Sequence, residues 1–113
     1  PGVNALIEEL EKEAIRKHAS VWAMGVIKSN KFVSHLAEII MDEDVPVKTR
    51  AQAIKSIKEI GHRMAVDPLT KILKSEEDSL RLLAVMALKE FRDVNVKIIS
   101  LSMSRLLIKS GFT

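Results

Sequence analysis

The side chains with the clearest chemical potential are basic, and they gather in three segments of the chain. Residues 14–28, 47–63 and 79–92 together hold eleven lysines and arginines against two acidic residues. The segments 3–13, 33–44 and 66–78 instead carry twelve acidic residues and three lysines. A surface that collects basic side chains attracts polyanions such as nucleic acid, or acidic peptides. The alternative explanation is the helix dipole, which favours acids at helix starts and bases in later turns.

Side chains suited to catalysis or metal binding do not combine into a recognisable site. The chain has no cysteine, which excludes disulfides and thiolate metal sites. His18, His35 and His62 lie on different segments without the spacing of metal ligands. Neither a glycine-rich phosphate loop nor a nucleophile–base pair can be argued. We therefore predict a protein that is not an enzyme and that uses no cofactor and no metal.

One helical pattern recurs along the chain and must position the basic side chains. Thr49–Gly61 matches Leu80–Arg92 after a shift of 31 residues and Ile15–Ile27 after a shift of 34. These shifts superpose the three arginines Arg16, Arg50 and Arg81, which fall inside the apolar arc of their helices. Because unpaired buried charge is costly, we expect these arginines to be paired and structural.

A second pattern, shorter and one-faced, precedes each copy of the first. It covers 3–13, 32–41 and 66–74, and a longer helix is expected over 95–109. Pro46 and Asp67-Pro68 are start signals, the aspartate as a cap and the prolines for the first turn. Gly61 is expected to end its helix in the left-handed conformation. We therefore predict seven helices, arranged as three antiparallel helix pairs and a half repeat.

Length and composition agree with this reading. The 113 residues are 47% hydrophobic and 29% charged, which suits one soluble helical domain. No apolar run approaches the roughly 18 residues of a membrane span, so no membrane partner is expected. The absence of cysteine is consistent with a cytoplasmic location. Because the chain begins Pro1-Gly2 rather than with methionine, we expect a processed or trimmed product.

The repeated units resemble HEAT repeats, and the first is similar to the short variety of bilin-lyase-like proteins. The residues that carry this resemblance are Ile15-Arg16, Ala19, Trp22-Ala23-Met24-Gly25, Val66-Asp67-Pro68-Leu69, Leu80-Arg81, Ala84 and Ala87-Leu88. The resemblance implies an all-α fold, a right-handed α-α solenoid of about three and a half helical hairpins whose second helices line the concave face. The expected units are 3–31, 32–65, 66–94 and 95–113, in one domain over 1–113. In similar repeats the arginine bridges to acids between units, here Asp44, Asp67 or Asp78.

Two surfaces are candidates for binding. The first is the concave face, with contact residues expected at Lys17, Lys48, Gln52, Lys55, Arg63, Leu82, Val85, Met86, Lys89 and Arg92. The second is the apolar segment 95–112, which is expected either to cap the array or to bind another protein or a second copy. Trp22 is the one stacking candidate and is expected in the core, which weakens single-stranded nucleic-acid binding.

Three functions remain open on these grounds. The favoured function is a protein-binding or scaffolding module that uses the concave face and the C-terminal helix. The alternative is nucleic-acid binding through Lys17, Lys48, Lys55, Arg63, Lys89 and Arg92. The resemblance also implies a third, less favoured role in attaching or isomerising a bilin chromophore, although the array is short and nothing in it marks a tetrapyrrole pocket.

Overall fold

The computed structural model describes residues 2–91, and these form helices joined by short loops. The α-helices are α1 (Gly2–Ile27), α2 (Val33–Met41), α3 (Val47–Ile60), α4 (Val66–Ile72) and α5 (Asp78–Leu88). Two short 3-10 helices, η1 (Asn30–Phe32) and η2 (Arg63–Ala65), lead into α2 and α4. Over the described residues the prediction of an all-helical fold is confirmed. The seventh predicted helix, over 95–109, lies outside the described residues.

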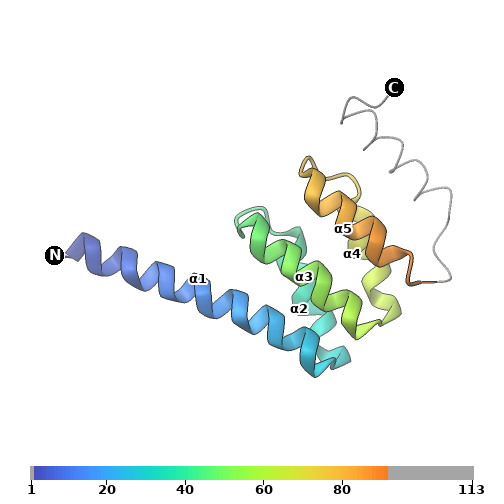
Figure 1. Cartoon of the computed structure of the whole chain (residues 1–113), viewed down its shortest axis with the longest axis horizontal. Helices are drawn as coiled ribbons and strands as arrows, with labels where there is room; N and C mark the ends of the chain where they lie inside the picture. The colour runs from blue at the N-terminus through green and yellow to red at the C-terminus, as the bar shows by residue number, and fades with distance from the viewer. Residues whose placement is uncertain (1, 92–113) are drawn as a thin grey trace.

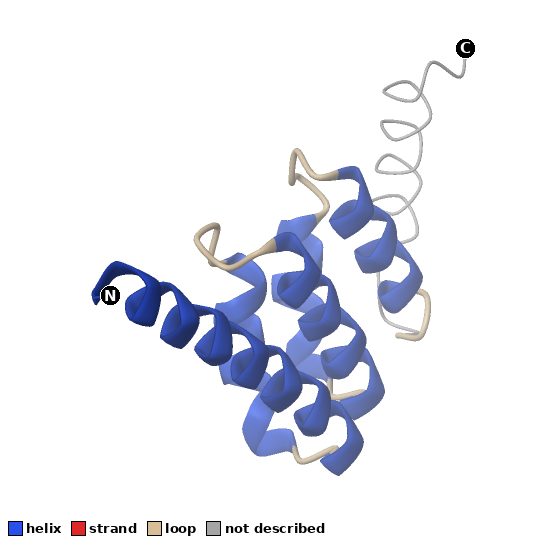
Figure 2. Ribbon diagram, turned by 60° about the vertical axis from the view of Figure 1, so that its left-hand side comes forward, coloured by secondary structure: helices blue, strands red, loops and turns tan. Residues whose placement is uncertain are grey.

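The helices lie in two layers, with α1, α3 and α5 in one and α2 and α4 in the other (Figure 1). The chain runs up one layer and down the other, and the loops gather at two ends of the molecule (Figure 2). Helix α3 is central, because it contacts α1, α2 and α5. His18 meets Thr49 and Lys28 meets Glu59, so α1 and α3 run in the same direction.

Two of the units bury the same positions, as expected for copies of one pattern. In α3 the buried residues are Thr49, Arg50, Ala53, Ile54, Ser56 and Ile57. A shift of 31 turns these into the buried residues of α5, namely Leu80, Arg81, Ala84, Val85, Ala87 and Leu88. Between the first helices, Leu36, Ile39 and Ile40 of α2 correspond to Leu69, Ile72 and Leu73, which are also buried. The shared burial explains why the apolar pattern recurs, since each unit covers its neighbour.

The first unit differs from the prediction, because α1 is one continuous helix. A turn was expected between 13 and 14, with 3–13 folded back against 14–29; this is wrong. The sequence from Glu8 to Ala19 contains no proline, glycine or asparagine, and most of its residues favour helix. In contrast, the turn before α3 contains Asp42 and Pro46. The first unit is therefore a single long helix rather than a hairpin.

The register between the first two units also needs correction, from 34 residues to 33. Lys28 and Gly61 both end their helices in the left-handed region, with φ of 60° and 70°. Ser29 and His62 then cap the two 3-10 helices, accepting from the backbone N–H of Lys31 and Met64. Because α1 and α3 are each unbroken, this register carries back along both helices. The residue that corresponds to Arg50 is therefore Lys17, not Arg16.

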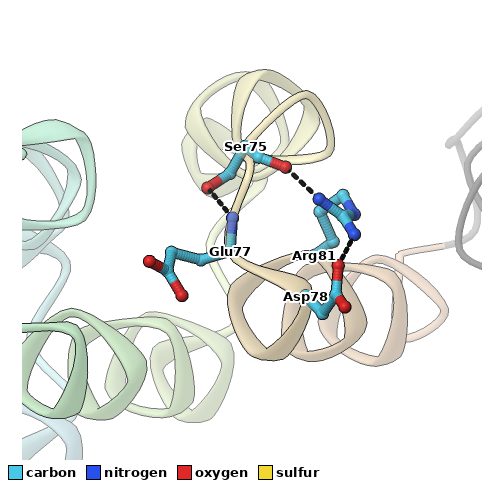
Figure 3. A network of polar contacts seen from close by, with 4 residues as sticks. All are labelled: Ser75, Glu77, Asp78 and Arg81. Atoms are coloured by element: carbon cyan, nitrogen blue, oxygen red, sulfur yellow. Dashed lines mark hydrogen bonds and ion pairs between the residues drawn. The ribbon is translucent and has the colours of Figure 1, made fainter. Parts of the chain in front are cut away.

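The two buried arginines tie each second helix to the element before it. Arg50 donates from Nε to the carbonyl of Ile40, at 2.9 Å. Arg81 donates to the carbonyl of Ser75 and forms an ion pair with Asp78 (Figure 3). The structural role predicted for both arginines agrees with these contacts, and Asp78 is one of the three predicted acids. For Arg50, however, the partner is a backbone carbonyl and not the expected acid. Ile40 lies in the last turn of α2, where backbone carbonyls have no hydrogen-bond donor within the helix.

Helix ends agree with the sequence signals in part. Gly61 ends α3 as predicted, and Pro46 lies directly before the first residue of α3. Asp67 is not a cap, because η2 places Ala65 at that position and leaves the carboxylate in the first turn of α4. There it pairs with Lys71 at 3.3 Å. Within residues 2–91, no helix is both long and apolar enough to cross a membrane.

Candidate binding face

Three parallel rows of side chains, all exposed except the half-buried Gln52, lie on the layer of α1, α3 and α5. Residues spaced by three or four lie in line on a helix surface. On α1 the row is Ile15, Ala19, Trp22 and Val26; on α3 it is Lys48, Gln52, Lys55 and Glu59; on α5 it is Leu82, Met86 and Lys89. We call these three rows together the second-helix face. It combines apolar side chains on α1, polar ones on α3, and two apolar residues with a lysine on α5.

Two clefts join the rows into one surface. The first lies between α1 and α3 and is lined by Trp22, Gly25, Val26, Lys28, Gln52, Lys55, Ser56 and Glu59. The second lies between α3 and α5 and is lined by Ile54, Lys55, Lys58, Glu59, Leu83 and Met86. Because Lys55 and Glu59 line both clefts, the ridge of α3 separates two adjacent grooves. A ligand that lies across the layer would contact all three helices.

The floor of the first cleft is held by a close contact between α1 and α3. A Cβ on Gly25 would lie 2.8 Å from the Cα of Ser56, so the two helices touch through their backbones. Ser56 Oγ donates to the carbonyl of Val21, at 2.7 Å, and Gln52 donates to Ser56 Oγ at 3.3 Å. These bonds are buried or half-buried, and they fix the spacing of the two rows.

The electrostatics of the face are mixed rather than uniformly basic. Lys48, Lys55 and Lys89 are exposed. Lys28 and Glu59 form an ion pair of 3.8 Å across the mouth of the first cleft. Both partners are more than half exposed, so the pair contributes little to stability. The face therefore offers a few separated cations around apolar side chains.

Most of the predicted contact residues lie on this face, and a few do not. Gln52, Lys55 and Met86 line its two clefts, while Lys48, Leu82 and Lys89 are exposed in the rows of α3 and α5 without lining either cleft. Lys17 is exposed on α1 but lines none of the clefts of this face. Arg63 lies in η2, beyond the end of α3, and is therefore not in line with Lys55. Arg92 lies outside the described residues.

Val85 is a wrong prediction, because it is only 1% exposed. It lies four residues after Arg81 and three before Leu88, and both of those are buried. These spacings place all three on one side of α5. Leu82 and Met86, in contrast, are about half exposed, at 52% and 50%. Only these two of the three apolar residues predicted on the far side of α5 reach the surface.

Sequence reasoning missed the apolar row on α1. Trp22 was expected in the core, but it is 57% exposed, and Ile15 and Val26 are exposed as well. The side of α1 that packs on α3 is instead the row of His18, Val21 and Gly25. A glycine inside a helix marks a close backbone approach, so Gly25 was the available signal for the packed side.

Histidines take structural or surface positions in the described residues. His18 Nδ1 lies 3.2 Å from Thr49 Oγ1, between α1 and α3. His62 caps η2 through Nδ1, and His35 is exposed on α2. Residues 2–91 contain no group of three or more metal-ligating side chains.

The fold and its face define an all-helical repeat protein with a surface built from successive second helices. The family model for HEAT repeats matches residues 33–104, which is more than half of the chain. The chain belongs to the HEAT repeat family. The match begins at the start of α2 and leaves out α1, in agreement with the departure of the first unit from a hairpin. The similarity of that unit to bilin-lyase-like repeats therefore stays a prediction. No curated protein and no solved structure matches the chain.

Proposed function

We propose that this chain is a non-enzymatic protein-binding module whose partner docks on the second-helix face. HEAT repeats generally mediate protein interaction or scaffolding. The observation that carries the proposal is the exposure of Trp22 and its neighbours Ile15 and Val26 beside a cleft. Tryptophan is enriched among the residues that dominate binding energy at interfaces. A solvent-exposed row of this kind is typical of an interaction site.

The chemistry of the face selects the kind of partner. The α1 row would receive apolar side chains, and Trp22 would cover the centre of the contact. Lys48, Lys55 and Lys89 would surround it with positive charge, which favours carboxylates on the partner. The best-matched ligand is therefore an acidic peptide or helix with two or three apolar residues. Charged rims contribute to association rate and selectivity more than to affinity.

A binding experiment with three proteins tests this proposal. A display library of random peptides is selected against the unaltered chain, and the selected peptides are tested on Trp22→Ala and Met64→Ala. Met64 is exposed in η2, away from the three rows, and serves as the matched control. We expect peptides rich in Asp, Glu and apolar residues, which bind Trp22→Ala at least tenfold more weakly and Met64→Ala equally well. Equal binding by all three proteins would refute this site.

Nucleic-acid binding is the competing function, and salt separates the two. Lys48, Lys55 and Lys89 could contact phosphates, but apolar side chains occupy the rows on either side of α3. Affinity for nucleic acid falls steeply with salt in proportion to the number of phosphates neutralised. Titration of duplex and single-stranded DNA at 50 and 200 mM salt therefore decides the question. We expect no binding of either DNA; affinity that falls about fortyfold, as three neutralised phosphates require, and that is lost in Lys48→Ala/Lys55→Ala would favour the competing function.

A further inference from the structure

The first half of α1 extends beyond the rest of the molecule. The start of α3 lies beside Ala14–Ala19, where Pro46, Lys48 and Thr49 line a shared cleft. Residues 2–13, which we call the overhang, therefore have no part of α3 next to them, and the helix projects away from the two layers (Figure 1). Every residue of the overhang is exposed. At 1.5 Å per residue, these twelve residues span about 18 Å.

The overhang carries an apolar stripe. Val3, Leu6, Ile7 and Leu10 recur at the spacing of one helix face, and their exposed fractions run from 48% to 71%. Three of these positions recur in α2 after a shift of 30, where Val33, Leu36 and Ile40 are buried in a helix that packs on α3. The stripe of the overhang is thus built like a packed helix face, but the described residues provide nothing that covers it.

Acidic side chains surround this stripe. Glu8, Glu9, Glu11 and Glu13 stand on the overhang against one base, Lys12, which pairs with Glu9 at 3.8 Å. Two overhangs packed against each other would bring eight carboxylates together, which is unfavourable. A partner helix that is apolar and basic would complement the stripe and its surroundings.

The sequence of the chain itself contains a segment with this chemistry. Residues 95–112 hold three basic residues and no acid. Ile98, Leu101, Arg105, Ile108 and Phe112 recur at alternating spacings of three and four, the pattern of one helix face. Val96, Ile99, Met103 and Leu106 form a second apolar row at the same spacings. If the segment is helical, its two apolar rows would allow it to pack against two neighbouring helices.

We propose that the overhang of one copy binds the segment 95–112 of a second copy, in a head-to-tail contact. The row with Arg105 would lie on Val3, Leu6 and Leu10, and the bases would face the overhang glutamates. In the sequence, the segment 95–112 follows α5, and α3 lies between α5 and α1 (Figure 1). Because α3 separates α5 from the overhang within one chain, we favour the segment of a second copy as the occupant. Two copies can exchange the contact reciprocally, which would close a symmetric dimer. This surface is distinct from the second-helix face, so the two proposals succeed or fail independently.

Sedimentation of the full chain over a range of concentrations tests the contact. We expect reversible association that weakens at least tenfold in Leu6→Ser/Leu10→Ser. The matched control is Leu82→Ser/Met86→Ser, which removes apolar side chains of similar exposure from the second-helix face. Because all four positions are exposed, each variant should keep the helical circular dichroism of the unaltered chain. A species that stays monomeric up to the highest soluble concentration would overturn the proposal.

Charge exchange between two variants tests which segment is the occupant. One variant reverses the overhang, with Glu8→Lys, Glu11→Lys and Glu13→Lys, and the other carries Lys97→Glu, Arg105→Glu and Lys109→Glu. Each alone should associate at least tenfold more weakly than the unaltered chain, and an equimolar mixture should regain the lost affinity. Association that is weakened by Leu6→Ser/Leu10→Ser but is not regained in the mixture would show that another surface covers the overhang. That result would overturn the assignment to 95–112.

Discussion

Gly25 is the residue on which the contact between the first two units depends. A Cβ at this position would lie 2.7–2.9 Å from three atoms of Ser56, one of them the backbone Cα. Contacts of this length force the two helices apart, and overpacking of this kind costs about 1–3 kcal/mol. We therefore expect Gly25→Ala to lower the free energy of unfolding by that amount, although alanine is the better helix former. Urea denaturation followed by circular dichroism measures the change.

The control for this substitution is Gly2→Ala. Gly2 also lies in α1, but a Cβ there meets nothing within 4 Å. The two substitutions add the same methyl group to the same helix, so their difference isolates the contact with Ser56. A Gly25→Ala protein as stable as the Gly2→Ala protein would show that α1 and α3 do not approach closely at this point.

Lys28 holds a left-handed conformation that its side chain disfavours. Its φ is 60°, and its N–H donates to the carbonyl of Met24 at 3.0 Å as a helix-ending residue. Gly61 occupies the corresponding position of the next unit and adopts the same conformation without strain. For a non-glycine residue the left-handed conformation costs roughly 1–2 kcal/mol. Glycine avoids this strain but loses more conformational entropy on folding, which offsets part of the gain. We expect Lys28→Gly to stabilise the protein by about 0.5–1 kcal/mol relative to Lys28→Ala.

Lys28→Ala is the reference because it also removes the ion pair with Glu59 while keeping the strain. Thermal unfolding of the two variants under one set of conditions gives the comparison. The pair itself is exposed, so Lys28→Ala should differ from the unaltered chain by less than about 1 kcal/mol. If Lys28→Gly is the less stable of the two variants, the left-handed strain assigned to this position is absent.

At the scale of elements, α1 has two halves with different support. Its second half packs on α3 through Val21 and Gly25, while all of residues 2–13 are exposed. An isolated helix of this length is marginal in water, because helices gain most of their stability from packing. At concentrations where the chain is monomeric, we expect amides of the overhang to exchange at least tenfold faster than those around Val21. Hydrogen exchange measured residue by residue checks this, and equal protection along α1 would mean that the overhang is covered within one chain.

The long helix α1 also shows what could and could not be predicted from the sequence. The shift of 31 between α3 and α5 was predictable from residue types, because Arg50, Ala53 and Ile57 match Arg81, Ala84 and Leu88. The structure buries all of these positions. The pairing within the first unit was not predictable, because Val3, Leu6 and Leu10 have the spacing of α2 but lack a turn after them. A periodic pattern predicts a helix and its apolar side, but only a breaker predicts where the chain reverses. The missing breaker between Glu8 and Ala19 was the overlooked signal.

The candidate face was predicted in part for the same reason. The exposed positions of Lys48, Gln52 and Lys55 could be predicted from a helical-wheel projection of α3. In that projection the apolar residues form one clear side, and these three residues lie opposite it. On α1, both sides are apolar between Ile15 and Val26, so periodicity could not distinguish the packed row from the exposed one. The choice is made by tertiary packing at Gly25. No other element within residues 2–91 covers the row with Trp22.

At the scale of the whole molecule, α3 connects the two ends. It contacts α1 on one side and α5 on the other, with α2 beneath it. Ile57 lies at the centre of this arrangement and is fully buried. In a repeat array, stability is close to a sum of unit and interface terms, so a weakened central unit uncouples its neighbours. Removal of a large buried aliphatic side chain costs about 2–5 kcal/mol.

We therefore expect Ile57→Ala to lower stability by that amount and also to broaden the unfolding transition. Trp22 is the single tryptophan and lies on α1, so its fluorescence reports on the first interface, while circular dichroism reports on all helices. The two signals should change together in the unaltered chain and at different urea concentrations in Ile57→Ala. Ile15→Ala, the same truncation at a site 69% exposed, should leave both signals coincident. Coincident transitions in Ile57→Ala would mean that the two ends are coupled by contacts other than those of α3.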